Sequence, residues 1–200
     1  MPKYKKKKVL VACEFSGIVR DAFIEQGHDA WSCDLLPSES NNGPHYQDSI
    51  HHVLTKTMYD WDMMIAHPPC TYLANSGVSW LYKQEGRWAK LREGALFFKQ
   101  LLEADIPKIC IENPIMHKYA VEIIGRRQDQ VIQPWQFGHG ETKATCLWLK
   151  NLPKLEPTNI VNGREQRLHR LPPSPGRAKE RSRTFKGIAK AMAKQWSDIY

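Results

Sequence analysis

The feature that most constrains the fold is an alternation of short apolar runs with longer amphipathic segments. "KVLVAC" (8–13) is rich in β-branched residues, and in "SGIVRDAFIEQG" (16–27) apolar residues recur at helical spacing until Gly27 ends the pattern. This order repeats downstream, so the chain is predicted to form an α/β fold with a doubly wound, mostly parallel sheet. Further strands are expected at 29–34, 59–66, 107–113, 130–135 and 145–150, the last two as an antiparallel edge pair, and further helices at 48–57 and 87–105.

Length and charge bound the number of domains and the kind of partner. Two hundred residues, 42% of them hydrophobic, suit one domain with a full core. The 29 Lys and Arg outnumber the 21 Asp and Glu, for a formal net charge of +8. This excess favours a polyanionic partner, with nucleic acid as the leading candidate. The alternative is that the charge only keeps a small protein soluble.

Cysteine and histidine usage indicates a reduced protein without a metal. The five cysteines are scattered singly with no CxxC pair, which is typical of a protein from a reducing compartment. No histidine stands in an HExxH or paired Cys/His spacing, so no metal site is expected. No apolar run approaches the roughly 18 residues of a membrane span, and "MPKYKKKKVL" has no cleavage-like site. The predicted location is cytoplasmic, without membrane contact.

Polar clusters follow four of the predicted strands. In doubly wound sheets, ligands bind outside the carboxyl ends of the strands, so these clusters are expected to share one rim. The clusters are Glu14 to Gly17, Asp34, His67 to Cys70, and Glu112 to Pro114.

The first two clusters suit a cofactor that carries adenosine. The turn "CEFSG" lets backbone approach a ligand closely and offers a helix N-terminus to an anionic group. With only Gly17 in place of a GxGxxG fingerprint, an ordinary strand-to-helix turn is equally compatible. Asp34 ends the second strand about twenty residues further on, where a carboxylate holds the hydroxyls of a ribose.

Cys70 is the candidate nucleophile. In "IAHPPCTYL" (65–73) two prolines remove two backbone donors and restrict two φ angles, so the thiol lies on a rigid loop leaving a strand. A free thiol is only a few per cent ionised at neutral pH, and a turn N-terminus and basic neighbours are expected to lower its pKa. Glu112, at the end of "KICIEN", is the expected acid partner with a raised pKa. The alternatives are a buried hydrophobic cysteine and a helix-capping carboxylate.

Taken in order, these residues resemble a known enzyme family. Phe15, Ser16 and Gly17, then Asp34 and Asp48, then Pro69 and Cys70, then Glu112 and Asn113 follow the motif order and spacing of the S-adenosylmethionine-dependent DNA cytosine-5 methyltransferases. The intervening "LREGALFFKQLLEADIPKICIENP" (91–114) is also similar to that family. The resemblance covers about residues 8–149 and implies a Rossmann-like sheet of the class I methyltransferase type.

The resemblance also implies a mechanism and a set of site residues. Cys70 would attack C6 of a flipped cytosine, Glu112 would hold or protonate N3, and C5 would take the methyl group from S-adenosylmethionine. Asn113 and Lys143 are the other expected catalytic-site residues. The expected cofactor residues are Phe15, Ser16, Gly17, Asp34, Leu35, Asp48, Ser49, Pro68 and Gly187.

Two late motifs depart from the family pattern. Where the family has "QxRxR", one arginine of which contacts the base, this chain has "ETKAT" (141–145), so Lys143 replaces one arginine and Thr145 the other. The tail "RTFKGIAKAMAKQW" (183–196) is similar to the family's final motif chiefly at Gly187. The predicted division is a catalytic core over 1–150, a loop over 151–182, and a C-terminal helix over 183–200 that packs back on the core.

The segment 151–182 stands where larger family members carry a target-recognition domain. It is rich in Pro and Arg and lacks periodicity, which predicts a mobile basic loop. Such a loop would contact phosphates without reading bases, and the alternative is a solvated linker. Trp80 follows the Pro-Pro-Cys loop in a polar stretch and is a candidate for stacking on a base, against plain packing. The basic candidates are Arg164, Arg167, Arg170, Arg177, Arg181 and Arg183.

The functional hypothesis from sequence is a small cytosine-5 methyltransferase acting on DNA, single-stranded or with the base flipped out, of the kind a compact genome such as a phage would encode. A partner chain would supply target recognition. "HPPCTY" is also similar to the "[DNS]PP[YFW]" loop of amino-group methyltransferases, but His67 and Cys70 suit neither hydrogen bonding to an amine nor stacking. Two alternatives stay open. One is the same chemistry on RNA or a free pyrimidine nucleotide, and the other is a catalytically weak module that binds nucleic acid and cofactor.

Overall fold

The computed structural model describes residues 5–56 and 60–197. The first residue of the predicted strand 59–66, the last of the predicted helix 48–57, and 198–200 of the predicted C-terminal segment lie outside the described residues. The strands are β1 (Lys8–Ala12), β2 (Asp29–Asp34), β3 (His45–Gln47), β4 (Met63–Ala66), β5 (Lys108–Asn113), β6 (Gln130–Ile132) and β7 (Thr145–Lys150). The helices are α1 (Ile18–Glu25), α2 (Ile50–Lys56), α3 (Arg87–Leu102), α4 (Lys118–Ile124), α5 (Arg167–Arg170), α6 (Arg177–Ser182) and α7 (Lys186–Trp196), with 3-10 turns η1 (Asn75–Tyr82) and η2 (Pro134–Gln136).

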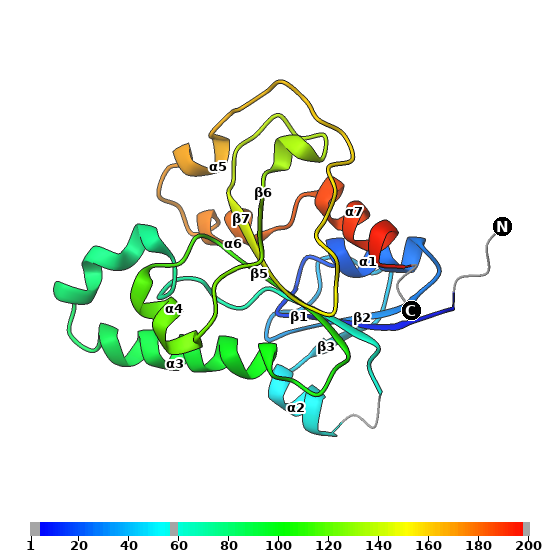
Figure 1. Cartoon of the computed structure of the whole chain (residues 1–200), viewed down its shortest axis with the longest axis horizontal. Helices are drawn as coiled ribbons and strands as arrows, with labels where there is room; N and C mark the ends of the chain where they lie inside the picture. Colours follow the sequence, from blue (N-terminus) through cyan, green and yellow to red (C-terminus); the bar gives the residue numbers. More distant parts are fainter. Residues whose placement is uncertain (1–4, 57–59, 198–200) are drawn as a thin grey trace.

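One seven-stranded sheet forms the centre of the molecule, in the order β3-β2-β1-β4-β5-β7-β6 (Figure 1). The pairs from β3 to β5 are parallel, and β7 runs antiparallel to both β5 and β6. The expected doubly wound, Rossmann-like and mostly parallel sheet is therefore confirmed, including the antiparallel pair at one edge. The short edge strand β3 is an addition that the sequence pattern missed.

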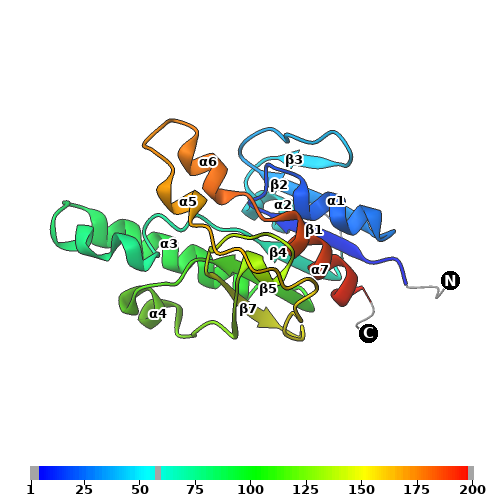
Figure 2. The ribbon, with the colours of Figure 1, turned by 90° about the horizontal axis from the view of Figure 1, so that it is seen from above.

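Helices cover both faces of this sheet, which is why its central strands are apolar without interruption. Along β1, Val9 and Val11 pack in the core beneath α1 and α7, while Leu10 and Ala12 pack in the core beneath α2, α3 and α4. All four side chains are fully buried, and each such aliphatic residue larger than alanine contributes about 1.5–3 kcal/mol. Figure 2 shows α1 and α7 side by side on one face.

The strand order reverses between β1 and β4. From β1 the chain proceeds outward to β2 and β3, whereas β4 and β5 build the other half of the sheet. This is the topological switch point, where two connections leave in opposite directions and open a crevice at the carboxyl ends. The backbone amide of His67, just after β4, donates to the carbonyl oxygen of Ala12 at the end of β1 (2.9 Å), so the two loops leave from one point.

The segment 151–182 has more regular structure and more tertiary contacts than its composition indicates. Helices α5 and α6 form within it, where the sequence pattern predicted an irregular loop. Leu155 and Leu168 are buried, and parallel bridges join Asn159 to Phe137 and Glu165 to Glu141. These contacts hold the segment beside the β6–β7 connection, so that the chain returns across the rim before α7 begins.

Candidate active site

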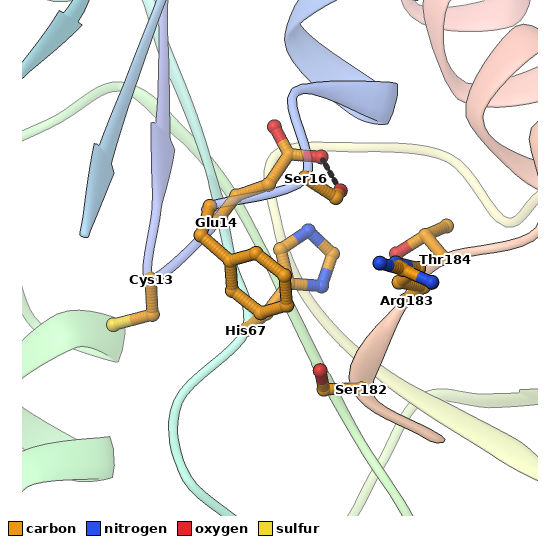
Figure 3. A pocket seen from close by; sticks show the side chains of 8 residues that line it. Cys13, Glu14, Ser16, His67, Ser182, Arg183 and Thr184 are labelled. Atoms are coloured by element: carbon orange, nitrogen blue, oxygen red, sulfur yellow. Dashed lines mark hydrogen bonds between the residues drawn. The ribbon is translucent and has the colours of Figure 1, made fainter. Parts of the chain in front are cut away.

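A cleft lies at the switch point and encloses about 280 Å³ of space, counting the part open to solvent. The turn after β1, the residue after β4 and the segment before α7 converge there (Figure 3). Its lining residues are Cys13, Glu14, Phe15, Ser16, His67, Ser182, Arg183 and Thr184. Two of the predicted cofactor residues, Phe15 and Ser16, therefore line the cleft that the fold itself marks as the ligand site.

The turn between β1 and α1 is shaped by Glu14. Its carboxylate accepts hydrogen bonds from the backbone amides of Val19 (2.7 Å) and Arg20 (3.2 Å) and from the hydroxyl of Ser16 (3.2 Å). It thus satisfies amides that the first turn of α1 leaves without helical partners. Burial raises the pKa of Glu14, and the charge of His67 and these donors oppose that rise in part. Gly17 precedes the helix at φ 73, a left-handed conformation that favours glycine.

Arg20 supports this turn from behind, although its side chain is completely buried. The guanidinium donates to the hydroxyls of Ser32 and Ser38 and to the backbone carbonyls of Ser40 and Pro44. It therefore holds the loop after β2 against α1. An arginine on an amphipathic helix is expected to face solvent, so no signal in the sequence pointed to this role.

Asp34 and Asp48 end neighbouring strands beside the cleft. The amide of Asp48 donates to the carbonyl oxygen of Asp34 (3.0 Å), and the Asp34 carboxylate accepts from the amide of Leu36 (2.9 Å). The Asp48 carboxylate accepts a hydrogen bond from the backbone amide of Ser49 (2.6 Å) and pairs with His52. Leu35, between them, has 74% of its surface exposed. The structure thus brings these predicted cofactor residues together at one end of the rim.

Glu112, the last but one residue of β5, is the most strongly held carboxylate at the rim. Only 9% of its side chain is exposed. Its Oε2 accepts from Nδ1 of His67 (3.1 Å) and from the hydroxyl of Thr184 (3.2 Å), and Lys143 Nζ lies 3.8 Å from Oε1. Burial alone would raise its pKa, but Lys143, His67 and Thr184 together outweigh burial and lower the pKa to about 2. The expectation of a raised pKa is therefore wrong, because the sequence did not show that His67, Thr184 and Lys143 would all surround this one carboxylate.

His67 completes an ion pair with Glu112. Burial would lower the pKa of this imidazole, yet the carboxylates of Glu112 and Glu14 raise it above the ordinary value, against the opposing charge of Lys143. The second ring nitrogen, Nε2, is buried without a hydrogen-bond partner in the described part of the chain. Only the position of His67, directly after an apolar strand, could have marked it from the sequence.

Cys70 lies on the loop after β4, as expected. Asn113 at the end of β5 donates to the carbonyl of Pro68 (2.9 Å) and so fastens this loop to the strand that carries Glu112. Burial raises the pKa of the Cys70 thiol, while Lys143 and Arg181 act to lower it and Glu112 raises it further. The predicted basic neighbours are present, but they do not offset the desolvation, so the expectation of a lowered pKa for the Cys70 thiol is wrong.

Lys143 links the late strands to the rim that carries Glu112. It stands on the β6–β7 connection, approaches Glu112, and donates to the carbonyl of Arg183 (3.3 Å). Gly187 instead lies in the first turn of α7, outside the cleft lining, where its backbone amide donates to Nε2 of His139 (3.0 Å). A Cβ on Gly187 would come within 1.9 Å of the carbonyl oxygen of Phe137, so the structure accounts for this glycine by packing.

The basic candidates of the segment 151–183 fall into two groups. Arg164 stacks over the ring of Trp135 (3.8 Å), Arg167 pairs with Glu141 and Glu180, and Arg183 pairs with Glu39 and Glu180. For Arg170 and Arg181, both exposed, no ion pair occurs within the described residues, and Arg177 is half-buried. Trp80 is 53% exposed on η1, so its indole is accessible.

Three further observations concern the described residues only. Within 5–56 and 60–197, no group of three or more His, Cys, Asp and Glu side chains is placed to hold a metal ion. None of the helices there is long and apolar enough to cross a membrane. All five cysteines are free.

In comparisons with known proteins, no family model matches the chain, and no curated protein matches it in sequence. Solved structures do match it. WbdD, crystallised with the kinase inhibitor LY294002, is 9% identical over 73% of this chain, with a TM-score of 0.44, and this chain spans 36% of that protein's length. A TehB-like SAM-dependent methyltransferase from Corynebacterium glutamicum is 16% identical over 64% of this chain and 68% of its own, with a TM-score of 0.34.

Proposed function

We propose that this protein is a methyltransferase that uses S-adenosylmethionine and modifies C5 of cytosine in DNA. The observation that carries the proposal is the position of Cys70 on the loop after β4, where the charge of the buried, ionised Glu112 near the end of the neighbouring strand β5 acts on the thiol. Lys143 acts on both groups. A nucleophile beside an oriented carboxylate and a cation is the arrangement that attack on a pyrimidine ring requires.

The residues near the switch point fit the proposed cofactor. Asp34 at the end of β2 has the position of a carboxylate that holds ribose hydroxyls, and exposed Leu35 beside it offers apolar surface to a base. Phe15 and Ser16 line the cleft in which the amino-acid part would lie, and the unpartnered Nε2 of His67 offers it a hydrogen bond. When bound, this cofactor supplies an electrophilic methyl group.

The chain's own residues account for the activation of the base. The sulfur of Cys70 forms a bond to C6, and the electron pair of the C5–C6 double bond then makes C5 nucleophilic. Lys143 and Arg181 stabilise the thiolate that must form first. After methylation the proton on C5 passes to water, the bond from sulfur to C6 breaks, and the double bond is restored. Because Glu112 is ionised before the substrate binds, it first meets the pyrimidine edge as a hydrogen-bond acceptor and has no proton of its own for N3.

Methyl transfer from labelled cofactor tests this proposal, with single-stranded DNA, duplex DNA, RNA and cytidine nucleotides as acceptors. Wild type is compared with Cys70→Ala and with Thr71→Ala, which removes the exposed neighbouring side chain. We expect label at C5 of cytosine in DNA, a loss of about a thousandfold or more in Cys70→Ala, and little change in Thr71→Ala.

The other outcomes separate the alternatives. Label on an exocyclic nitrogen, or transfer independent of Cys70, would overturn the proposed mechanism. Label on RNA or on the nucleotide alone would keep the chemistry and replace the substrate. If calorimetry detected cofactor binding while no acceptor was labelled, the chain would be a binding module and the proposed activity would be wrong.

A further inference from the structure

The proposed function uses only the Nε2 atom of His67 and leaves its ion pair with Glu112 without a role. His67 is the first residue after β4, about a tenth of its side chain is exposed (10%), and it lies where the cofactor cleft meets the catalytic rim. In Figure 3 its ring stands between the turn of Glu14 and Ser16 on one side and the segment of Arg183 and Thr184, before α7, on the other. A histidine in such a place either fills space or handles a proton.

The charged groups around His67 favour the charged imidazole. Glu112 from β5 accepts its Nδ1 proton, and Glu14 from the β1–α1 turn adds a second negative charge. Lys143 from the β6–β7 connection is the opposing positive charge. Thr184, from the segment before α7, donates to the same Glu112 oxygen as His67 and is uncharged. The two carboxylates and the one ammonium group leave a net negative charge around His67. This charge favours the protonated form of its imidazole.

The three donors around Glu112 favour the ionised carboxylate, which holds no proton of its own. Three donors approach Glu112, and a protonated carboxyl would accept from them less well. Yet activation of cytosine at C6 requires a proton or a donor at N3, because otherwise the ring carries the developing negative charge alone. The nearest titratable donor to Glu112 is His67.

We propose that His67 is a positioning residue that stores the proton which Glu112 delivers to N3 of the cytosine. This inference rests on the proposed function. As the sulfur of Cys70 bonds to C6, Glu112 takes the proton from Nδ1 of His67, which becomes neutral, and passes that proton to N3. When the sulfur leaves, the proton returns along the same path, so the site ends the cycle with the proton it began with.

The pH dependence of the rate distinguishes this role from simple packing. His67→Asn keeps a side-chain donor near the position of Nδ1 but has no proton to give. Below the raised pKa of His67 the wild type holds the stored proton, and we expect it to exceed His67→Asn in kcat by about tenfold or more. As the pH rises through that pKa the wild type loses the proton, so the ratio should fall toward one. A ratio that does not change with pH would overturn the inference.

A measurement without substrate keeps the inference independent of activity. Carbon-13 labelled histidine allows the His67 ring to be titrated by NMR, its signal being the one absent from His67→Asn. We expect a pKa above the ordinary 6.5 or so in wild type, a lower value in Glu112→Gln, and no change in Glu122→Gln, an exposed control on α4.

The two failures are distinguishable. A wild-type His67 that titrates at or below the ordinary value would overturn the storage role whatever the enzyme does. Transfer to cytosine with a constant ratio of wild type to His67→Asn would refute the role of His67 alone. Absence of transfer to any pyrimidine would remove the proposed function, and with it the delivery step.

Discussion

Two buried glutamates in one site, Glu14 and Glu112, have pKa values displaced in opposite directions. Both are desolvated, and burial is the largest influence on each. Glu14 accepts hydrogen bonds from backbone amides and one hydroxyl, and these do not outweigh the effect of burial on its pKa. Glu112 interacts with an imidazole, an ammonium group and a hydroxyl, and together these outweigh the effect of burial. The identity of a residue therefore leaves its ionisation undecided until its partners are known.

This difference predicts how stability depends on pH. The folded pKa of Glu112 lies below that of an unfolded glutamate, about 4.3, so its contribution is complete above that value and is lost as the pH falls toward 2. The folded pKa of His67 is raised, so its contribution is complete below about 6.5 and is lost as the pH rises through the folded value.

We therefore expect Glu112→Gln to lower the free energy of unfolding most between about pH 4.3 and 6.5, where both groups of the pair are charged. Breaking a buried ion pair by removing one partner costs about 3 kcal/mol, and the cost should shrink toward both acid and alkaline pH. Urea unfolding of the variant and wild type near pH 2.5, 5.5 and 9 would measure it, with Glu122→Gln as a control at an exposed site. A difference that stays constant with pH would contradict the assigned ionisation of the pair.

At the scale of elements, the first turn of α7 sets how closely the last helix approaches the β6–β7 connection. Gly187 lies against the backbone of Phe137, and its backbone amide donates a hydrogen bond to Nε2 of His139. From there α7 runs beside α1 and buries Ile188, Met192 and Trp196 in the core on that face. Thr184, whose hydroxyl donates to Glu112, lies just before this turn. The packing of α7 and the position of that hydroxyl therefore depend on the same junction.

Gly187→Ala is expected to disturb this junction. The added methyl would meet a carbonyl oxygen at 1.9 Å, and since that oxygen belongs to backbone, helix or loop must shift. We expect a loss of about 2–3 kcal/mol in the free energy of unfolding, typical of overpacking in a tight contact. Gly176→Ala is the control, because no atom lies within 4 Å of its added carbon and its φ is −85°. Equal midpoints for the two variants in urea would refute the packing role.

At the scale of the whole molecule, only some of the basic side chains behind the net charge of +8 are free to contact a partner. Around α6 and the rim, Glu39 pairs with Lys179 and Arg183, and Glu180 pairs with Arg167. These cations already have anionic partners within the chain. Exposed Arg170 and Arg181 have none among the described residues, and Arg181 also acts on the thiol of Cys70.

This distribution predicts which arginine contributes to binding of nucleic acid. Affinity for DNA should fall with salt, and Arg181→Gln should reduce the slope of log affinity against log salt by about 0.7–0.9, the effect of one phosphate contact. Lys190→Gln, an exposed change on α7, removes the same charge elsewhere and should leave the slope nearly unchanged. Fluorescence anisotropy with labelled single-stranded and duplex DNA would measure both. Equal slopes for the two variants would mean that binding depends on overall charge alone.

The sequence by itself determined the elements and the rim. Strands of uninterrupted apolar residues, such as β1 and β4, must be buried on both faces, and that burial requires helices on both sides of a parallel sheet. Parallel strands place their carboxyl ends at one edge, so the sequence alone predicts Glu14, Cys70 and Glu112 at one rim. These conclusions depend on local periodicity and on chain direction, both of which can be read directly from the residues.

Only the tertiary structure decided the chemistry of that rim. The ionisation of Glu112 depends on His67, Lys143 and Thr184, which come from three other parts of the chain, and Arg20 is buried by a loop twenty residues away. The short helices α5 and α6 likewise form on contacts with distant residues such as Glu39 and Glu141. Electrostatic interactions and packing act through space over a few ångströms, and a sequence pattern carries no record of which distant groups the fold brings within that range.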